Sequence, residues 1–371
     1  MKNIYKTLLT ICLSALLVQM ANGQGGICLR KAVPYKAGKF SFSACTGDFK
    51  GDGKPDVAVV NYNSDIVSVF INNGDGTFQP AVSYSSGHYP TSVKSADVNN
   101  DGKQDLIVTN TGSETISIFI GNGDGTFQAK KDIPGGAFPC YVAIADFNHD
   151  KNIDFAISND SSNLVTIYMG KGDGTFTTTN SYDVGQYPSP IAIADFNGDG
   201  SDDLVVTNTG SNSISVLMGK GDGTFGTATT YPVGSYPNCV AAADFNGDKK
   251  PDIAVVNSAN GSVSMLINKG DGTFARPINY AAGGGPISIV AVDFSKDGAM
   301  DFAVCNAGTN NISVFINNGT GMFPEPTNFQ TGISPICILS DDFNKDGIPD
   351  LITVNNNDNG TISVFLGCPS K

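Results

Sequence analysis

Short apolar runs rich in β-branched residues alternate along this chain with turns rich in Gly, Asn and Asp. Around residue 195, four such runs cover 191–196, 203–208, 214–218 and, less regularly, 225–233. Runs of about five to nine residues with this composition are typical of β-strands. The group of four recurs at a step of 49 residues, in seven copies. The pattern predicts an all-β protein in which one four-stranded unit is repeated seven times.

Four antiparallel strands in a repeat of about 50 residues are the unit of a β-propeller blade. We name these strands A to D from the centre outward. The last copy ends after its strand C, at 365–367, whereas an additional strand D around Tyr35 precedes the first copy. Joining the two ends would remove the exposed strand edge of an open array. We therefore expect a single domain over 24–371, a seven-bladed β-propeller of four-stranded antiparallel blades whose N-terminal strand joins the last blade.

Two cysteines lie where this ring would close. Cys368 aligns with Asn73 of the first copy and Cys28 with Thr77, and these two positions flank the G-D-G turn between strands C and D. We expect a Cys28–Cys368 disulfide in place of the missing turn. The alternative is two free thiols at frayed ends. The pairing of Cys45, Cys140, Cys239, Cys305 and Cys337 stays open.

An acidic loop of the form D-F-N-x-D-G-x-x-D follows strand A in every copy and begins at residues 48, 97, 146, 195, 244, 293 and 342. We number these loops 1 to 7. Oxygen-bearing side chains at positions 1, 3, 5 and 9 can wrap one cation, and Gly at position 6 permits a sharp bend. The pattern contains no thiol or imidazole, which favours calcium over zinc. The alternative is a set of Asx turns that need no metal.

The loops differ in their fitness for calcium. Lys50 occupies position 3 of loop 1, and Lys151 and Lys249 replace the Gly at position 6 of loops 3 and 5. We expect up to seven calcium ions, with loops 2, 4 and 7 binding best and loops 1, 3 and 5 weaker. The candidate ligands are Asp48, Asp52, Asp56, Asp97, Asn99, Asp101, Asp105, Asp146, Asn148, Asp150, Asp154, Asp195, Asn197, Asp199, Asp203, Asp244, Asn246, Asp248, Asp252, Asp293, Ser295, Asp297, Asp301, Asp342, Asn344, Asp346 and Asp350.

The motif D-F-N-G-D-G, followed by G-D-G-T-F in the hairpin between strands C and D, resembles the FG-GAP and VCBS-type repeats. These repeats build the propeller head of integrin α-chains and many secreted bacterial proteins. The resemblance covers nearly all of residues 28–368, and it implies a seven-bladed, calcium-bearing propeller. It leaves the ligand open, because this fold hosts adhesion, lectin and lyase activities.

The net charge and the N-terminal segment bear on the protein's partners and its location. The formal net charge is -13, which argues against binding to nucleic acid or to an anionic membrane. Residues 1–23 combine Lys2 and Lys6 with an apolar run over 8–18 and small residues before a plausible cleavage site. This pattern predicts a signal peptide, because the run is too short for a membrane anchor. We expect a secreted or extracellular surface protein with no transmembrane segment in the mature chain.

The connections from strand B to C and from D to the next A share the face opposite the acidic loops. Tyr89, Phe138, Tyr187 and Tyr236 lie beside Pro on that face and are candidate ligand contacts. The alternative is that these rings pack between blades at the channel mouth. We favour a protein-binding or adhesion scaffold whose partner is an extracellular protein or glycan.

A calcium-dependent lectin is the second reading of this face, although the chain contains no Trp. A polysaccharide-active enzyme is third. The two histidines, His88 and His149, lie in different copies, and the regular Asp residues belong to the acidic loops. No Ser-His-Asp set or separate carboxylate pair is therefore visible, and we expect no enzymatic activity.

Overall fold

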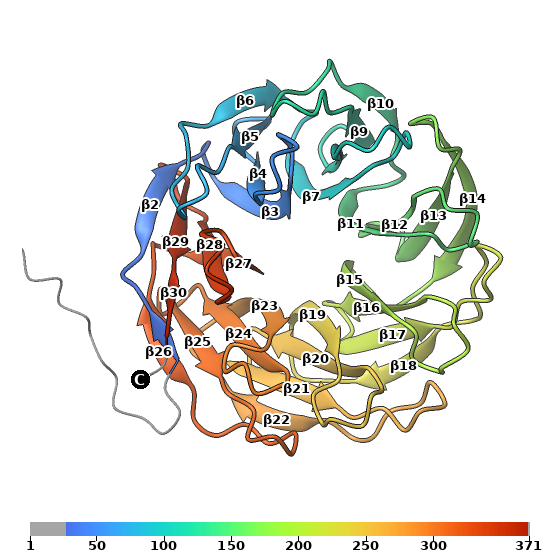
Figure 1. Cartoon of the computed structure of the whole chain (residues 1–371). Coiled ribbons are helices and arrows are strands. Elements are labelled where there is room, and N and C mark those ends of the chain that lie inside the picture. The colour runs from blue at the N-terminus through green and yellow to red at the C-terminus, as the bar shows by residue number, and fades with distance from the viewer. Residues whose placement is uncertain (1–26, 370–371) are drawn as a thin grey trace, which may run out of the picture.

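The computed structural model describes residues 27–369, and the predicted signal peptide lies outside the described residues. Of the thirty β-strands, β1 to β30, twenty-eight form seven four-stranded antiparallel sheets arranged as blades around a central opening, and β1 and β30 pair with each other (Figure 1). No helix occurs in this part of the chain, and so none that is long and apolar enough to cross a membrane. The predicted all-β, seven-bladed propeller is confirmed.

Strands A line the opening and strands B follow them outward. Strands A are β3 (Ser41–Gly47), β7 (Pro90–Ala96), β11 (Pro139–Ala145), β15 (Pro188–Ala194), β19 (Pro237–Ala243), β23 (Pro286–Val292) and β27 (Pro335–Asp341). Strands B are β4 (Asp56–Asn61), β8 (Asp105–Asn110), β12 (Asp154–Asn159), β16 (Asp203–Asn208), β20 (Asp252–Asn257), β24 (Asp301–Asn306) and β28 (Asp350–Asn355). Every strand B therefore begins at the Asp of position 9 in its acidic loop.

Strands C and D complete each blade toward the outer rim. Strands C are β5 (Ile66–Phe70), β9 (Thr115–Phe119), β13 (Leu164–Gly170), β17 (Ser213–Leu217), β21 (Ser262–Leu266), β25 (Asn311–Phe315) and β29 (Thr361–Phe365). Strands D are β6 (Val82–Ser85), β10 (Lys131–Pro134), β14 (Phe176–Asp183), β18 (Thr229–Pro232), β22 (Ile278–Ala281), β26 (Thr327–Gln330) and, for the last blade, β2 (Val33–Lys36).

Strands B are apolar along most of their length because both faces of each strand are covered by neighbouring blades. All six residues of β4 are buried. Val57 and Val59 pack against the last blade, in one cluster with Phe343, whereas Ala58 and Val60 pack against the second blade. Successive side chains of a strand point to opposite sides. A continuous apolar strand therefore supplies two inter-blade cores at once.

Pairs of phenylalanines join neighbouring blades beneath the acidic loops. The Phe at position 2 of a loop meets the Phe of the G-D-G-T-F hairpin in the next blade, edge to face. Ring centroids lie 5.4 Å apart for Phe49 and Phe127 and 5.4 Å for Phe196 and Phe274. Such aromatic pairs contribute about 0.5–1.5 kcal/mol beyond the area that they bury. The two repeated motifs thus meet through such a pair at five of the blade junctions within the described residues, whereas loop 2 has Val98 at position 2.

The ring closes as predicted. β2, near the N-terminus, pairs with β29 and completes the last blade, where blue and red strands lie side by side in Figure 1. Beyond it, β1 (Cys28–Leu29) pairs with β30 (Gly367–Cys368), with Cys28 opposite Cys368. These two cysteines form the predicted disulfide, at a Cα–Cα distance of 5.1 Å. Within the described residues, the five other cysteines, whose pairing the sequence left open, are free thiols.

Candidate functional site

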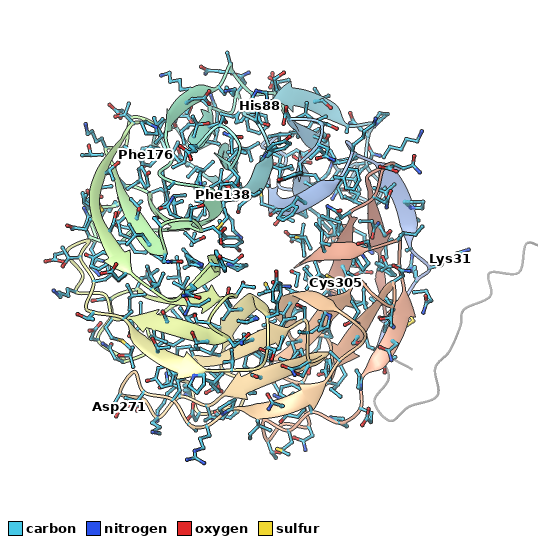
Figure 2. The ribbon with its side chains drawn as sticks, turned by 180° about the vertical axis from the view of Figure 1, so that it is seen from behind. Lys31, His88, Phe138, Phe176, Asp271 and Cys305 are labelled. Atoms are coloured by element: carbon cyan, nitrogen blue, oxygen red, sulfur yellow. A yellow bond between two sulfur atoms is a disulfide. The ribbon has the colours of Figure 1, made fainter. Side chains whose placement is uncertain are left out.

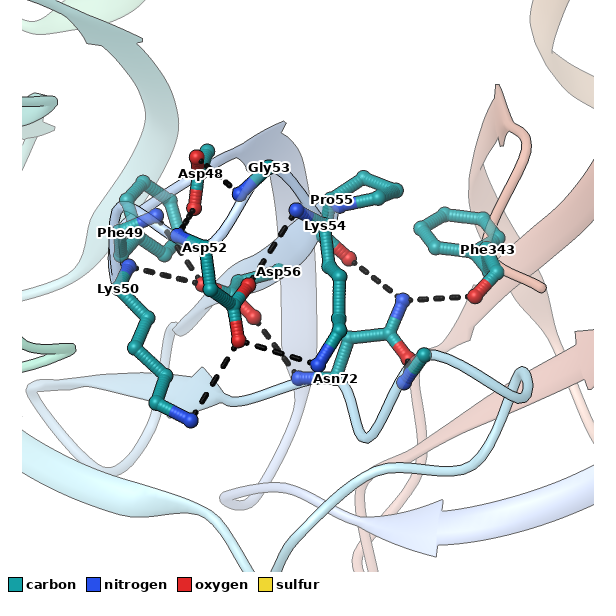
Figure 3. A network of polar contacts seen from close by, with 11 residues as sticks. Asp48, Phe49, Lys50, Asp52, Gly53, Lys54, Pro55, Asp56, Asn72 and Phe343 are labelled. Carbon is teal, nitrogen blue, oxygen red and sulfur yellow. Dashed lines mark hydrogen bonds and ion pairs between the residues drawn. The ribbon is translucent and has the colours of Figure 1, made fainter. Parts of the chain in front are cut away.

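The aspartate at position 9 is the structural centre of each acidic loop. Asp56 is buried, and its Oδ2 accepts hydrogen bonds from the backbone N–H groups of Phe49 (3.0 Å) and Lys50 (3.2 Å). Its Oδ1 accepts one from the N–H of Asn72, at the end of strand C (2.8 Å; Figure 3). The carboxylate therefore ties three segments of one blade together. Both oxygens are engaged in the same way in Asp105, Asp154, Asp203, Asp252, Asp301 and Asp350.

Positions 1, 3 and 5 form the exposed part of the loop, and loop 4 shows their geometry. Asp195 accepts hydrogen bonds from the N–H groups of Asp199 (3.1 Å) and Gly200 (2.8 Å). Asp199 in turn accepts from the N–H of Ser201 (2.8 Å) and from the amide of Asn197 (2.9 Å). These are Asx turns, in which side-chain oxygens accept from nearby backbone groups. The loop thus folds on its own amides.

Negative charge is concentrated at the base of each loop. Burial raises the pKa of the position-9 carboxyl to about 6 in Asp56, Asp105, Asp154, Asp203, Asp252 and Asp350, although backbone N–H groups lower it. Carboxylates of the same loop raise it further. A divalent cation placed among these groups would offset their mutual repulsion.

The donor types of the loops fit a hard cation, since carboxylate, amide and hydroxyl oxygens are the ligands that calcium takes. Within residues 27–369, however, no three acidic, histidine or cysteine side chains are arranged as metal ligands. The carboxylates at positions 1 and 5 already accept from loop amides such as those of Asp199 and Gly200, and their remaining lone pairs are the ones that a calcium ion would use. Calcium binding stays a prediction.

The loops that the sequence predicts to bind calcium unequally also differ in their local structure. In loop 1, the ammonium groups of Lys50 and Lys54 lie 3.4 Å and 3.2 Å from Oδ2 of Asp52, so lysines already neutralise this carboxylate. Position 6 has a positive φ in every loop, including 71° at Lys151 and 68° at Lys249. A side chain other than Gly is strained there. Loops 3 and 5 thus adopt the same bend at a cost in backbone energy.

The acidic loops also fasten each blade to the next. The carbonyl of Phe49 in loop 1 accepts a hydrogen bond from the N–H of Gly125, in the G-D-G turn of the second blade (2.9 Å). At the ring closure, the side chain of Asn72 in the first blade donates to the carbonyl of Phe343 in loop 7 (2.8 Å; Figure 3). The loops and the C-to-D hairpins therefore share one face, as expected from the strand order.

The opposite face is formed by the B-to-C turns and the D-to-A connections, and we call it the mouth face. The exposed fractions of Tyr89, Phe138, Tyr187 and Tyr236 on this face are 47%, 43%, 56% and 55%. None of the four belongs to an inter-blade core, and Phe138 lies beside the central opening in Figure 2. Burial in the inter-blade cores therefore does not account for these side chains, although Tyr89 does contact the neighbouring blade at the surface.

The four aromatic residues are held in a strained backbone conformation. Their φ angles are 54°, 59°, 53° and 61°, in the left-handed region that bulky residues avoid. The N–H of Tyr187 is fixed by the side chain of Asn163 (3.0 Å), and that of Tyr236 by Asn212 (2.9 Å). The equivalent residues Phe40, Gly285 and Ser334 have φ angles of 52°, 62° and 55°, so this turn belongs to every copy, and four copies use it to hold an exposed aromatic side chain.

A larger aromatic cluster on the mouth face escaped the sequence analysis. The rings of Tyr62 and Tyr89 are stacked at 4.7 Å, and Phe42 lies 5.8 Å from Tyr62. Beside them, Nδ1 of His88 is 2.8 Å from Oδ2 of Asp65. Tyr62 occupies a position where other copies have Thr, Asp, Ser, Ala or Asn. An aromatic residue at a position that is small or polar in the other six copies is the sequence signal from which this cluster could have been predicted.

The mouth face opens into a central cavity of about 810 Å³. Phe42, Tyr62 and Phe138 line its entrance, and Lys94 and Tyr141 lie on its wall. The sequence analysis did not identify these last two residues as site residues. Cavities that bind small molecules have volumes of about 300–1,000 Å³. The ring therefore presents two candidate binding regions that are continuous, the aromatic face and the channel behind it.

Comparison with known structures shows the fold. The chain is similar to BBS1N, solved in complex with ARL6DN, with a TM-score of 0.66 and 11% identity over 92% of this chain and 97% of that chain. A streptogramin B lyase gives a TM-score of 0.64 and 15% identity over 91% and 97%. An Agrocybe aegerita lectin that recognises non-reducing terminal N-acetylglucosamine gives 0.60 and 20% over 88% and 85%. At these identities the likeness extends to the fold alone. No curated protein sequence matches the chain.

The repeat itself identifies the family. The FG-GAP-like repeat matches six overlapping segments, 48–108, 97–157, 146–206, 195–255, 244–304 and 297–353. Each of the first five segments runs from one acidic loop into strand B of the next copy. It therefore includes an acidic loop, the hairpin between strands C and D, and the start of the next blade. Together the segments cover most of the ring, and the chain belongs to the FG-GAP-like repeat family.

Proposed function

We propose that this protein is a secreted or cell-surface scaffold that binds another protein through the mouth face. The observation that carries the proposal is the set of half-exposed aromatic side chains held there at positive φ. Tyr is enriched in protein–protein interfaces, where its ring supplies apolar area and its hydroxyl a hydrogen bond. A rigid aromatic residue also loses little conformational freedom on binding.

The arrangement of the aromatic residues around the ring favours an extended partner. They precede four consecutive inner strands, from Tyr89 before β7 to Tyr236 before β19. The equivalent position in the first blade is Phe40, which has a positive φ but is less exposed, and those in the last two blades are Gly285 and Ser334. The contact surface is therefore an arc over one side of the ring. An arc of this kind suits a protein surface better than a single small ligand.

Calcium has a structural role in this proposal. The acidic loops form the blade junctions on the face opposite the aromatic arc, so calcium in the loops would stabilise the ring and would not contact the partner. Such binding adds stability according to the free calcium concentration relative to the affinity of each loop. Loops 2, 4 and 7, with Asn99, Asn197 and Asn344 at position 3 and Gly at position 6, are the sites that we expect to fill first.

Photo-cross-linking tests the proposed interface. A photoreactive phenylalanine at position 187 is compared with the same group at position 278, because Ile278 is similarly exposed on the outer strand β22. Each protein is irradiated with an extracellular protein fraction from its source. We expect protease-sensitive adducts from position 187 only. Equal adduct formation at both positions, or none at position 187, would contradict the proposal.

A calcium-dependent lectin is the second candidate, and one observation favours it. The rings of Tyr187 and Tyr236 have no counterpart of the stacking partner Tyr62 and are more than half exposed, so each leaves ring surface for a sugar. A glycan array with calcium and with chelator distinguishes the two functions. Specific binding that is lost in Tyr187→Ala but kept in Ile278→Ala would establish the lectin in place of the protein scaffold.

A further inference from the structure

One lysine interrupts the repeat inside the channel. Lys94 lies on β7, and the equivalent positions in the other six blades are Cys45, Ala143, Ala192, Ala241, Val290 and Leu339. Cys45, Val290 and Leu339 line the same cavity as Lys94. Six copies thus place a small or apolar side chain in this layer of the ring, and one places a cation. A cation in an apolar enclosure is costly unless something compensates it.

Tyr141 on the neighbouring strand β11 also departs from the repeat. The other copies have Ser, Pro or Cys at its position. Nζ of Lys94 lies 5.4 Å from the centroid of the Tyr141 ring, within the range of a cation–π contact. The contact places the ammonium group beside the Tyr141 side chain, and an ammonium group has three N–H donors, so it can also donate to a ligand. Two residues that break the repeat therefore meet on one side of the channel.

No anion of the described residues compensates Lys94. It takes part in none of their ion pairs. Burial raises the pKa of the nearby thiols, to about 12 for Cys45 and about 11 for Cys337, so both are neutral near pH 7. Burial also raises the pKa of Tyr141, which therefore keeps its hydroxyl proton. Asp160 also lines the cavity. It lies in the turn that follows strand B of the third blade, β12, and it forms no ion pair with Lys94.

We propose that the channel binds a small monocarboxylic acid whose carboxylate contacts Lys94 and Tyr141. A single ammonium group balances a single negative charge, whereas a phosphate dianion would leave one charge without a cationic partner, because Lys94 is the only Lys or Arg among the described residues that line the cavity. Part of the cavity wall, on β23 and β27, carries the apolar side chains of Val290 and Leu339. This wall suits the hydrocarbon body of an aliphatic or aromatic acid. The site lies in the channel behind the mouth face, and Phe138 borders both regions; the residues that define it, Lys94 and Tyr141, are not part of the proposed interface, so each proposal can be tested without the other.

Isothermal titration calorimetry of the whole ring with benzoate tests the site. We expect one benzoate ion to bind per chain and benzamide, its neutral counterpart, to bind at least about tenfold more weakly, since a charge-assisted contact contributes more than about 1.4 kcal/mol. Lys94→Met should weaken benzoate binding by about tenfold or more, and Lys94→Arg should restore most of it. Tyr141→Phe should weaken it several-fold. Lys36→Met, which removes an exposed lysine from β2, is the matched control and should change nothing.

Three results would overturn the proposal. The first is the absence of benzoate binding at millimolar concentration, and the second is unchanged affinity in Lys94→Met. The third is inorganic phosphate or benzamide binding as tightly as benzoate, which would contradict the assignment to a monocarboxylate. Other blades carry Val or Leu in this layer, so a folded Lys94→Met variant is expected. If it does not fold, the contrast between benzoate and benzamide on the wild-type ring and on Tyr141→Phe decides the question.

Discussion

The disulfide between Cys28 and Cys368 joins two residues that are 340 positions apart, and its removal is the sharpest test of how the ring is held closed. In the double variant Cys28→Ser/Cys368→Ser, the native ring keeps its other closing contacts. β2 still pairs with β29, and Arg30 N–H still donates to the carbonyl of Leu366 (2.8 Å). The unfolded chain, by contrast, loses a constraint on nearly its whole length. The variant should therefore fold to the same structure with a lower free energy of unfolding.

The size of the effect follows from the loop that the disulfide closes. In the chain-entropy treatment, a loop of this length removes roughly 19 cal/mol/K from the unfolded ensemble, or about 6 kcal/mol at 25 °C. Residual structure in the unfolded chain lowers this figure. We expect a loss of about 3–6 kcal/mol, larger than that of most single substitutions. The denaturant dependence of the unfolding free energy should also increase, because the opened chain exposes more surface when it unfolds.

Guanidinium unfolding, followed by far-ultraviolet circular dichroism, measures both quantities. The oxidised wild type, the reduced wild type and the double variant are compared, and the last two should coincide. A midpoint in the double variant equal to that of the oxidised wild type would refute the reasoning. So would a reducing agent that destabilises the double variant as much as the wild type, because it would show that the effect of reduction does not come from this disulfide.

Four further predictions concern the loops and the thiols. Asp203→Asn should destabilise the protein by about 1–3 kcal/mol, because one buried backbone N–H loses its acceptor. Urea unfolding measures this loss, and the matched control Asp202→Asn should show little change. Chelation of calcium should lower the melting temperature, and an unchanged melt would contradict metal binding by the loops. Lys249→Gly should stabilise the protein by about 0.5–1 kcal/mol in chelator, by relieving the positive φ at position 6. Because burial raises the pKa of Cys45 and Cys140 to about 12, native alkylation of both at pH 8, followed by mass spectrometry, should be about a thousandfold slower than in denaturant.

Much of the fold was predictable from the sequence because each repeated position has a local physical role. Strand B was predicted over 203–208 and is observed as Asp203–Asn208, since Asp at its start and Asn at its end mark turns. Strand D was less well predicted, over 225–233 against Thr229–Pro232. Phe225 belongs instead to the hairpin and forms an isolated bridge with Gly219. An aromatic residue such as Phe225 is typical of a strand, so the sequence pattern placed it in strand D, whereas in the structure it lies in the hairpin before that strand.

The acidic loops show where sequence reasoning about a site stops. Carboxylates at alternate positions indicate a cation site, but the same residues also satisfy the amides of a tight turn, as Asp195 and Asp199 do in loop 4. The double role of position 9 was not visible in the sequence, because the acceptor for the end of strand C comes from a residue 16 positions earlier, as with Asp203 and Gly219. Spacing identifies the oxygens, whereas their partners depend on the folded blade.

The channel and the mouth face were hard to predict for the opposite reason, because their distinctive residues depart from the repeat. A seven-fold repeat builds a channel with equivalent walls, and such a channel cannot fix the orientation of an asymmetric ligand. Tyr62, Lys94 and Tyr141 each occur in one blade, and those blades are the first three in the chain. All three residues line one cavity, with Phe138 at its entrance. The residues that are repeated in every copy form the blade junctions. Ligand specificity therefore has to come from the residues that differ between copies, at positions that face the channel or lie on the mouth face. A ring that bound its ligand through repeated residues alone would tolerate the loss of any one of them, whereas this ring should lose its channel ligand with Lys94 alone.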